Sequence, residues 1–143
     1  MAGDLPDDIV GRRELVGNAL ADLEAALAAP AGTGDEWRER VEEAVHHLQD
    51  VGREQLAAFV GAEGLLDRIV AADEAQAPRA ERLRGRIPDL ERNLNEVLGA
   101  LDHGTPEEIR EASIELLIDV VRVRHQTADI LYDAFWRDVG DPG

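Results

Sequence analysis

The chain contains no cysteine. Disulfide bonds, thiolate metal sites and cysteine nucleophiles are therefore excluded. It also has no apolar run near the roughly 18 residues that a membrane-spanning helix needs. Residues 1–4 lack the basic stretch, followed by an apolar stretch, that marks a signal peptide. We therefore expect a cytoplasmic protein. A length of 143 residues suits a single domain, residues 1–143, with one hydrophobic core.

Lysine is absent too, so arginine supplies all 15 basic residues, against 31 acidic residues and a net charge of −16. A surface of this sign repels the phosphates of nucleic acids and anionic lipids. We therefore expect no nucleic-acid partner and no membrane partner. GC-rich codon usage and a salt-adapted cytoplasm both favour such a composition, and the sequence leaves the two open.

The sequence offers little catalytic chemistry. It has no glycine-rich phosphate loop, and Ser113 has no histidine at helical spacing to activate it. The acidic residues are many, but the helical pattern puts most of them on solvated faces. Two Trp, one Tyr and two Phe are too few and too scattered to stack nucleobases. We therefore interpret the protein as non-enzymatic.

A helix over residues 105–140 is the strongest predicted element, because both of its ends are marked in the sequence. Thr105 can accept a hydrogen bond from a free N–H of the first turn, and Glu108 can reach back in a capping box. Pro106 fits the first helical position, where its missing N–H costs nothing. Gly140 suits a left-handed stop at the other end.

Apolar residues recur at intervals of three and four in three more stretches, which predicts helices there. We place these helices at residues 6–29, 35–61 and 79–102, and a short amphipathic helix at 65–70. Pro88 lies inside the third long helix, whose apolar seam keeps its phase, so we expect a kink rather than a break. No stretch alternates with period two, so no strand is predicted. The sequence thus predicts an all-α fold, an antiparallel four-helix bundle with a short extra helix between helices two and three.

The fourth predicted helix carries two apolar lines. Its central line consists of Ser113, Leu117, Val120, Arg124, Ala128, Leu131 and Phe135. A second line, which repeats every seven residues as a helix-to-helix seam does, consists of Ile109, Leu116, Val123 and Ile130. Because one bundle seam needs only the first line, we expect the second to pair two copies of the chain into a homodimer through helix four. The alternative is that residues 65–70 cover it within one chain.

Histidine and carboxylate spacing offers one route to a metal site. Glu43-x-x-His46 matches the Glu-x-x-His spacing of di-iron carboxylate bundles. The helical pattern nevertheless places His46 and His47 on flanks away from the inward face, so we expect solvated histidines. On the fourth helix, His125 and Asp129 lie one turn apart, and we expect a partly buried, hydrogen-bonded histidine there. A rearranged site made of these five residues is the metal-binding alternative.

Three stretches of the chain resemble the hemerythrin-like (HHE) family of four-helix bundles. They read Gly-Ala-Glu-Gly-Leu-Leu at 61–66, Arg-Leu-Arg-Gly-Arg-Ile-Pro-Asp-Leu at 82–90 and Ile-Leu-Tyr-Asp-Ala-Phe at 130–135. The resemblance spans roughly residues 60–140. It implies a four-helix bundle and a pair of irons held by histidines and carboxylates on the inner helix faces.

The chain departs from that pattern where the resemblance places the iron ligands. The first helix has Arg12 and Arg13 where a ligand histidine would stand. The second has Gln55 and, one turn later, Phe59, and the third has Ile87. The fourth offers a single histidine, and the whole chain has four. The resemblance therefore implies the fold without the iron chemistry, so we expect no cofactor, with iron as the alternative.

Polar residues replace those ligands on core-facing lines, namely Arg13, Gln55 and Arg124. Buried arginines need carboxylate partners or water, because an unpaired charge in a dry core is costly. One interpretation is a small polar pocket for an anion or a carboxylate-bearing metabolite, and the other is that both arginines reach solvent at the bundle ends. Our leading hypothesis is a non-enzymatic bundle that acts through protein contacts or this pocket. A metalloprotein and a small-molecule sensor are the alternatives.

Overall fold

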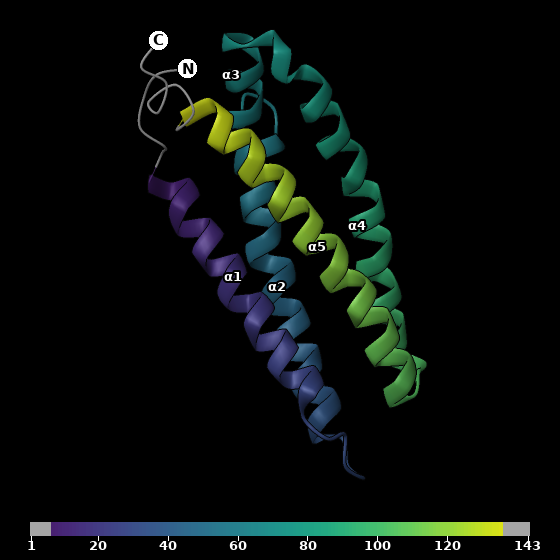
Figure 1. Ribbon diagram of the computed structural model, residues 1–143. Coiled ribbons are helices and arrows are strands. Elements are labelled where there is room, and N and C mark those ends of the chain that lie inside the picture. Colours follow the sequence, from purple (N-terminus) through teal and green to yellow (C-terminus); the bar gives the residue numbers. More distant parts are fainter. Residues whose placement is uncertain (1–6, 136–143) are drawn as a thin grey trace.

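Five α-helices make up the computed structural model, which describes residues 7–135 of the chain (Figure 1). They are α1 Asp7–Ala28, α2 Glu36–Val60, α3 Leu65–Ala72, α4 Ala77–His103 and α5 Pro106–Phe135, and the 3₁₀ helix η1 Glu74–Gln76 follows α3. The described residues contain no strand. The four long helices form an antiparallel bundle with a short helix between the second and third, which confirms the predicted fold. The predicted helix stop at Gly140 lies outside the described residues.

Two helical hairpins build the bundle. Helix α1 packs along α2, and α4 packs along α5, while contacts between the two hairpins are sparser. In Figure 1, α1 lies on the left and α4 on the right, α5 passes in front of the upper part of α2, and α3 lies at the top. Helix α4 continues through Pro88 as a single helix, as its unbroken seam predicts. None of the helices within residues 7–135 is long and apolar enough to cross a membrane.

Helix α5 faces the core along one seam, which contains residues from both of the apolar lines predicted for this helix. Its buried residues at alternating intervals of four and three are Ile109, Ser113, Leu116, Val120, Val123, Thr127, Ile130 and Ala134. Every member of the line expected at a dimer surface belongs to this seam and is at most 8% exposed. Leu117, Arg124 and Ala128, which were expected to face inward, are half-buried at its margin. The predicted dimer surface is therefore wrong, because the inward direction of α5 falls between the two lines.

The buried apolar residues of the bundle form two clusters, one at the α3 end and one further along, and both cover this seam. At the α3 end, Val123 and Ile130 pack with the apolar residues of α3 and with Phe59, so the short helix supplies the intramolecular cover named as the alternative. Further along the bundle, Ile109 and Leu116 pack with residues of α1, α2 and α4. A single chain thus buries the whole seam without a partner.

Two arginines join the hairpins at the end of the bundle away from α3. Arg38 of α2 donates hydrogen bonds of 2.5 and 2.7 Å to two backbone carbonyls at the C-terminal end of α4. Arg110 of α5 donates hydrogen bonds of 3.3 and 3.0 Å to two backbone carbonyls at the C-terminal end of α1. Its guanidinium also lies 4.7 Å from the centre of the Trp37 ring. The last carbonyls of a helix lack intrahelical partners and carry partial negative charge, so both contacts stabilise helix ends.

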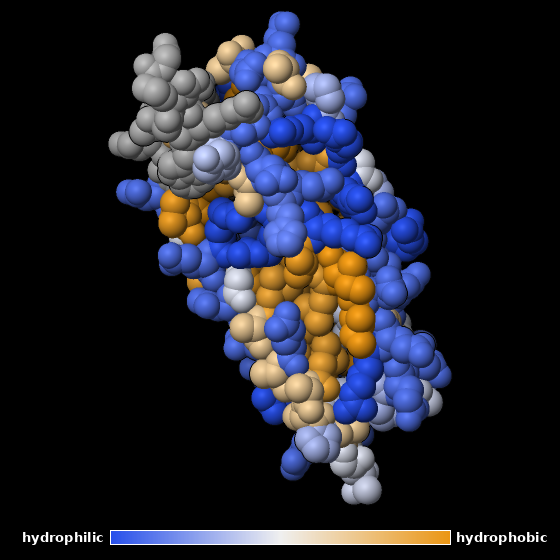
Figure 2. Space-filling view, viewed as in Figure 1, coloured by the Kyte–Doolittle hydropathy of each residue, from blue (hydrophilic) through white to orange (hydrophobic). Residues whose placement is uncertain are grey.

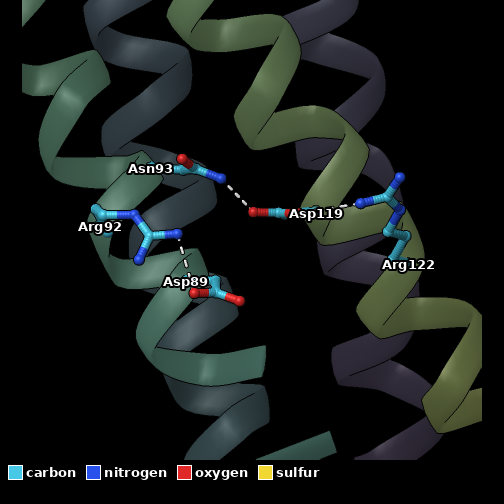
Figure 3. Close-up of polar contacts among 5 residues, drawn as sticks. All are labelled: Asp89, Arg92, Asn93, Asp119 and Arg122. Atoms are coloured by element: carbon cyan, nitrogen blue, oxygen red, sulfur yellow. Dashed lines mark hydrogen bonds and ion pairs between the residues drawn. The ribbon is translucent and has the colours of Figure 1, made fainter. Parts of the chain in front are cut away.

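Polar contacts outside the core link α4 to α5 (Figure 3). Asn93 of α4 donates a hydrogen bond to Asp119 of α5. The Asp119 carboxylate also lies 3.9 Å from the Arg122 guanidinium, and Arg92 pairs with Asp89 at 2.9 Å within α4. Arginines on this face therefore lie next to carboxylates.

Candidate functional site

A cavity of about 80 Å³ lies between the four long helices, where the two apolar clusters of the core meet. Most of its wall is apolar. The apolar lining comes from Val16 of α1, Leu48, Leu56 and Phe59 of α2, Leu90 and Leu94 of α4, and Leu116, Val120 and Val123 of α5. This volume corresponds to roughly three water molecules in the liquid, so the space suits waters or a body of a few carbon atoms.

Gly52 of α2 accounts for part of this space. It lines the cavity, and a Cβ atom added at this glycine would meet no atom within 4 Å. Arg53 of α2 and Glu91 of α4 are lining residues whose side chains are 60% and 44% exposed and lie 3.8 Å apart. The cavity therefore reaches solvent between α2 and α4. An ion pair as exposed as this one contributes little to stability, so it does not seal the opening.

Three neutral polar side chains, those of Gln49, Gln55 and Thr127, belong to the cavity wall. The Thr127 hydroxyl donates a hydrogen bond of 2.7 Å to the Val123 carbonyl one turn earlier, so it is already occupied. Gln55 is a residue that is only 9% exposed, and its amide has no hydrogen-bond partner among residues 7–135. An amide offers two donors and one acceptor, so Gln55 presents unused hydrogen-bonding capacity to the cavity.

A pair of half-buried arginines lies where α5 approaches α1. Arg124, a lining residue of the cavity, donates from Nη1 to the backbone carbonyl of Arg13 at 3.0 Å. Its Nη2 lies 3.3 Å from the place that a Cβ atom on Gly17 would take. Gly17 therefore lets the guanidinium lie directly against the α1 backbone.

The charges of this arginine pair are not balanced by acids. Neither Arg13 nor Arg124 forms an ion pair with a carboxylate of the described residues, and the buried Nη1 of Arg13 has no hydrogen-bond partner there. Burial, and after it the neighbouring Arg124 guanidinium, lower the pKa of Arg13 below its usual value. Of the two kinds of partner expected for a buried arginine, a carboxylate or water, the described residues supply no carboxylate. Helix α5 brings Arg124 to a main-chain carbonyl of α1 instead.

The residues predicted for a polar pocket occupy neighbouring parts of this region. Gln55 and Arg124 line the cavity, whereas Arg13 lies beside Arg124 but outside the lining. Gly17 and Gly52 were missed as parts of the site. Gly17 follows Arg13 by one helical turn, so their shared face was visible in the sequence. The position of α5 against that face was not.

The histidines and their expected partners lie on outer surfaces. Glu43, His46 and His47 are exposed on α2, and His125 and Asp129 are exposed on α5. The prediction of a partly buried His125 is therefore wrong, because the outward rotation of this part of α5 places it in solvent. Within the described part of the chain, no group of three or more His, Asp or Glu side chains could hold a metal ion. The structure thus lends no support to a rearranged metal site of these five residues.

The inner wall also fails to fit the irons that the hemerythrin-like resemblance implies. Its polar groups are the amides of Gln49 and Gln55, the Arg124 guanidinium and the Thr127 hydroxyl, with Arg53 and Glu91 at the opening. A guanidinium has no acceptor atom and stays protonated in proteins, so Arg124 cannot ligate a metal and repels one. We derive no chemistry through iron.

No family model matches the chain, and neither the curated proteins nor the solved structures contain a significant match. The bundle is therefore established by the structure itself, and the hemerythrin-like resemblance stays a prediction.

Proposed function

We propose that this protein is a non-enzymatic, hemerythrin-like helical bundle without the di-iron ligand set, and that it binds a small molecule in the cavity between its helices. The observation that carries the proposal is Gln55, a residue that is 9% exposed and whose amide lines the cavity without a hydrogen bond to the described chain. The donors and the acceptor of this amide are therefore open to the cavity. A bound molecule can form hydrogen bonds with them.

The remainder of the wall favours a ligand with an apolar body. Small-molecule sites are mostly apolar clefts with a few polar groups that fix the orientation of the ligand. This cavity has that composition, and Leu48, Val120 and Val123 are among its apolar residues. Its one hydroxyl, on Thr127, is held by the carbonyl of Val123. These observations support binding rather than catalysis.

An NMR titration of ¹⁵N-labelled protein with butan-1-ol tests this proposal. We expect saturable shift changes at the resonances of Gly52 and Gln55. The variant Gly52→Leu places a side chain in the open space of the cavity and is expected to abolish these changes. The matched control is Gly99→Leu, at an exposed glycine of α4 where an added Cβ also meets nothing within 4 Å. Identical, unsaturable shifts in the wild type and in Gly52→Leu would show that the cavity binds nothing.

The outer side of α5 favours a second candidate function, self-association. Ile114, Ile118 and Val121 are 51%, 40% and 38% exposed. They follow one another at intervals of four and three, as in a helix-to-helix seam. Figure 2 shows an apolar area over α1 and α5 that is bordered by polar residues. We propose that α5 of a second copy packs antiparallel on this line, because Glu115 of each copy then approaches Arg122 of the other.

Light scattering at increasing protein concentration tests the self-association. We expect a dimer for the wild type and a folded monomer for Ile118→Glu. Leu15→Glu is the control, because Leu15 is 46% exposed but belongs to α1, and this variant should remain a dimer. A wild type that stays monomeric at high micromolar concentration in moderate salt would exclude the homodimer.

A further inference from the structure

Arg13 and Arg124 form a local excess of positive charge inside an acidic protein. The chain has 31 acidic residues and 15 basic ones, and Arg12, the chain neighbour of Arg13, pairs with Asp8 at 2.7 Å. Arg13 and Arg124 nevertheless lie together without a carboxylate among the described residues. Two positive charges close together in a half-buried site repel each other. An anion bound there would relieve this repulsion.

Among the described residues, the orientation of Arg124 leaves hydrogen-bond donors free for such an anion. One of its five N–H groups is used within residues 7–135, by Nη1 on the carbonyl of Arg13. This bond, together with the absence of a side chain at Gly17, holds the guanidinium of Arg124 against α1. Arg124 also lines the cavity, so its guanidinium lies at the cavity edge. The buried Nη1 of Arg13, which has no hydrogen-bond partner in the described part of the chain, supplies a further donor. Gln55 adds a neutral amide to the same cavity.

We infer that the cavity takes a small monocarboxylate with a short apolar tail, its carboxylate on Arg124 next to Arg13 and its tail among the apolar side chains. This inference rests on the proposed function, because it names the class of ligand for the same cavity. A guanidinium holds a carboxylate by two parallel hydrogen bonds. The volume of about 80 Å³ accommodates a tail of about three carbon atoms beside the head group, judged against the volume of a water molecule.

The apolar wall of the cavity favours a carboxylate with an apolar tail over an inorganic anion. Phosphate can also pair with arginines, but it is strongly hydrated and would leave the apolar space beyond Arg124 unfilled. Leu48, Leu94 and Leu116 line that space. A ligand with one charged end and one apolar end matches both parts of the site.

Butanoate, butan-1-ol and inorganic phosphate, titrated separately into ¹⁵N-labelled protein, test this inference. Butanoate and butan-1-ol share a tail and differ in the charged head group. We expect butanoate to bind at least about tenfold more tightly, because hydrogen bonds to an ionised partner are stronger than neutral ones. Arg124→Gln should remove this preference, so that butanoate and butan-1-ol bind the variant with similar affinity. The control Arg122→Gln, at a side chain that is 58% exposed on the same helix, should keep the preference.

The outcomes separate the inference from the proposed function. If butan-1-ol binds in the cavity and butanoate binds no more tightly, or if Arg124→Gln retains the preference, the anion site is wrong while the ligand-binding cavity stands. If only phosphate binds, and Gly52→Leu does not affect it, the inference and the cavity proposal are both wrong. A preference for butanoate that is lost in both Arg124→Gln and Gly52→Leu supports both.

Discussion

Arg124 donates a hydrogen bond of 3.0 Å from Nη1 to the backbone carbonyl of Arg13, so a side chain of α5 meets the main chain of α1. The two guanidinium groups are near enough for Arg124 to contribute to the lowered pKa of Arg13. From the sequence we expected each buried arginine to meet either a carboxylate or water. Two half-buried cations without an acid disfavour each other in the free protein, and the same arrangement attracts an anion. The folding energetics and the ligand preference of the cavity therefore have a common origin.

The substitution Arg124→Leu should leave the free energy of unfolding unchanged within about 1 kcal/mol, or raise it. It removes one hydrogen bond to a carbonyl within α1, but it also relieves the repulsion from Arg13 and adds an apolar side chain to the cavity wall. Urea denaturation of the wild type and the variant measures the difference. A loss of about 3 kcal/mol, the usual result of breaking a buried ion pair, would reveal an acidic partner and contradict the arginine pair.

The substitutions Gly11→Ala and Gly17→Ala should differ, although both glycines lie in α1. Alanine stabilises an exposed helix interior by up to about 1 kcal/mol relative to glycine, and an added Cβ at Gly11 meets nothing within 4 Å. At Gly17 it would lie 3.3 Å from Nη2 of Arg124, so the guanidinium must move. We expect a smaller gain in melting temperature and weaker butanoate binding for Gly17→Ala. Equal gains and equal binding would show that Arg124 does not rest on this glycine.

The substitution Arg110→Leu should lower the free energy of unfolding by about 2 kcal/mol. The variant loses two hydrogen bonds to the end of α1 and the contact with the Trp37 ring. Arg40→Leu is the control, because Arg40 is exposed and forms no hydrogen bond or ion pair within residues 7–135. Thermal unfolding of the two variants, side by side, measures the difference. If both variants unfold at the same temperature, the arginine does not tie the hairpins together.

The substitutions Val123→Glu and Val121→Glu test which side of α5 faces inward. Val123 is 8% exposed and Val121 is 38% exposed. A carboxylate at Val123 must be buried without a partner, so we expect a loss of more than about 3 kcal/mol or an unfolded protein. Val121→Glu should remain folded. Circular dichroism of both variants decides, and a folded Val123→Glu would mean that the observed seam is wrong.

Protein purified without chelator should contain only substoichiometric iron and be colourless. The wall of the cavity offers Gln55 and Arg124 where the hemerythrin-like resemblance implies ligands, and a guanidinium repels metal cations. Elemental analysis and visible absorption measure the metal content. A stoichiometric iron content with a charge-transfer band would overturn the proposed loss of the metal site.

The sequence by itself determined where the long helices lie and how α5 begins. The hydroxyl of Thr105 accepts a hydrogen bond of 3.2 Å from the N–H of Glu108, as the capping pattern predicts. Helix α4 crosses Pro88 without a break, as the phase of its seam predicts. Signals of this kind act through neighbours within one or two helical turns, so a single stretch of sequence contains all the information that they need.

The tertiary structure decided the rotation of α5 and the composition of the site. Ile114 and Val123 are both apolar, and only packing against the other helices leaves the first 51% exposed and the second 8% exposed. Arg124 meets a carbonyl 111 residues away along the chain, a partner that no local pattern specifies. Side-chain periodicity limits the inward face of a helix to a broad arc. Packing against the neighbouring helices determines which line within that arc is buried, because each rotation of the helix about its axis buries a different set of side chains.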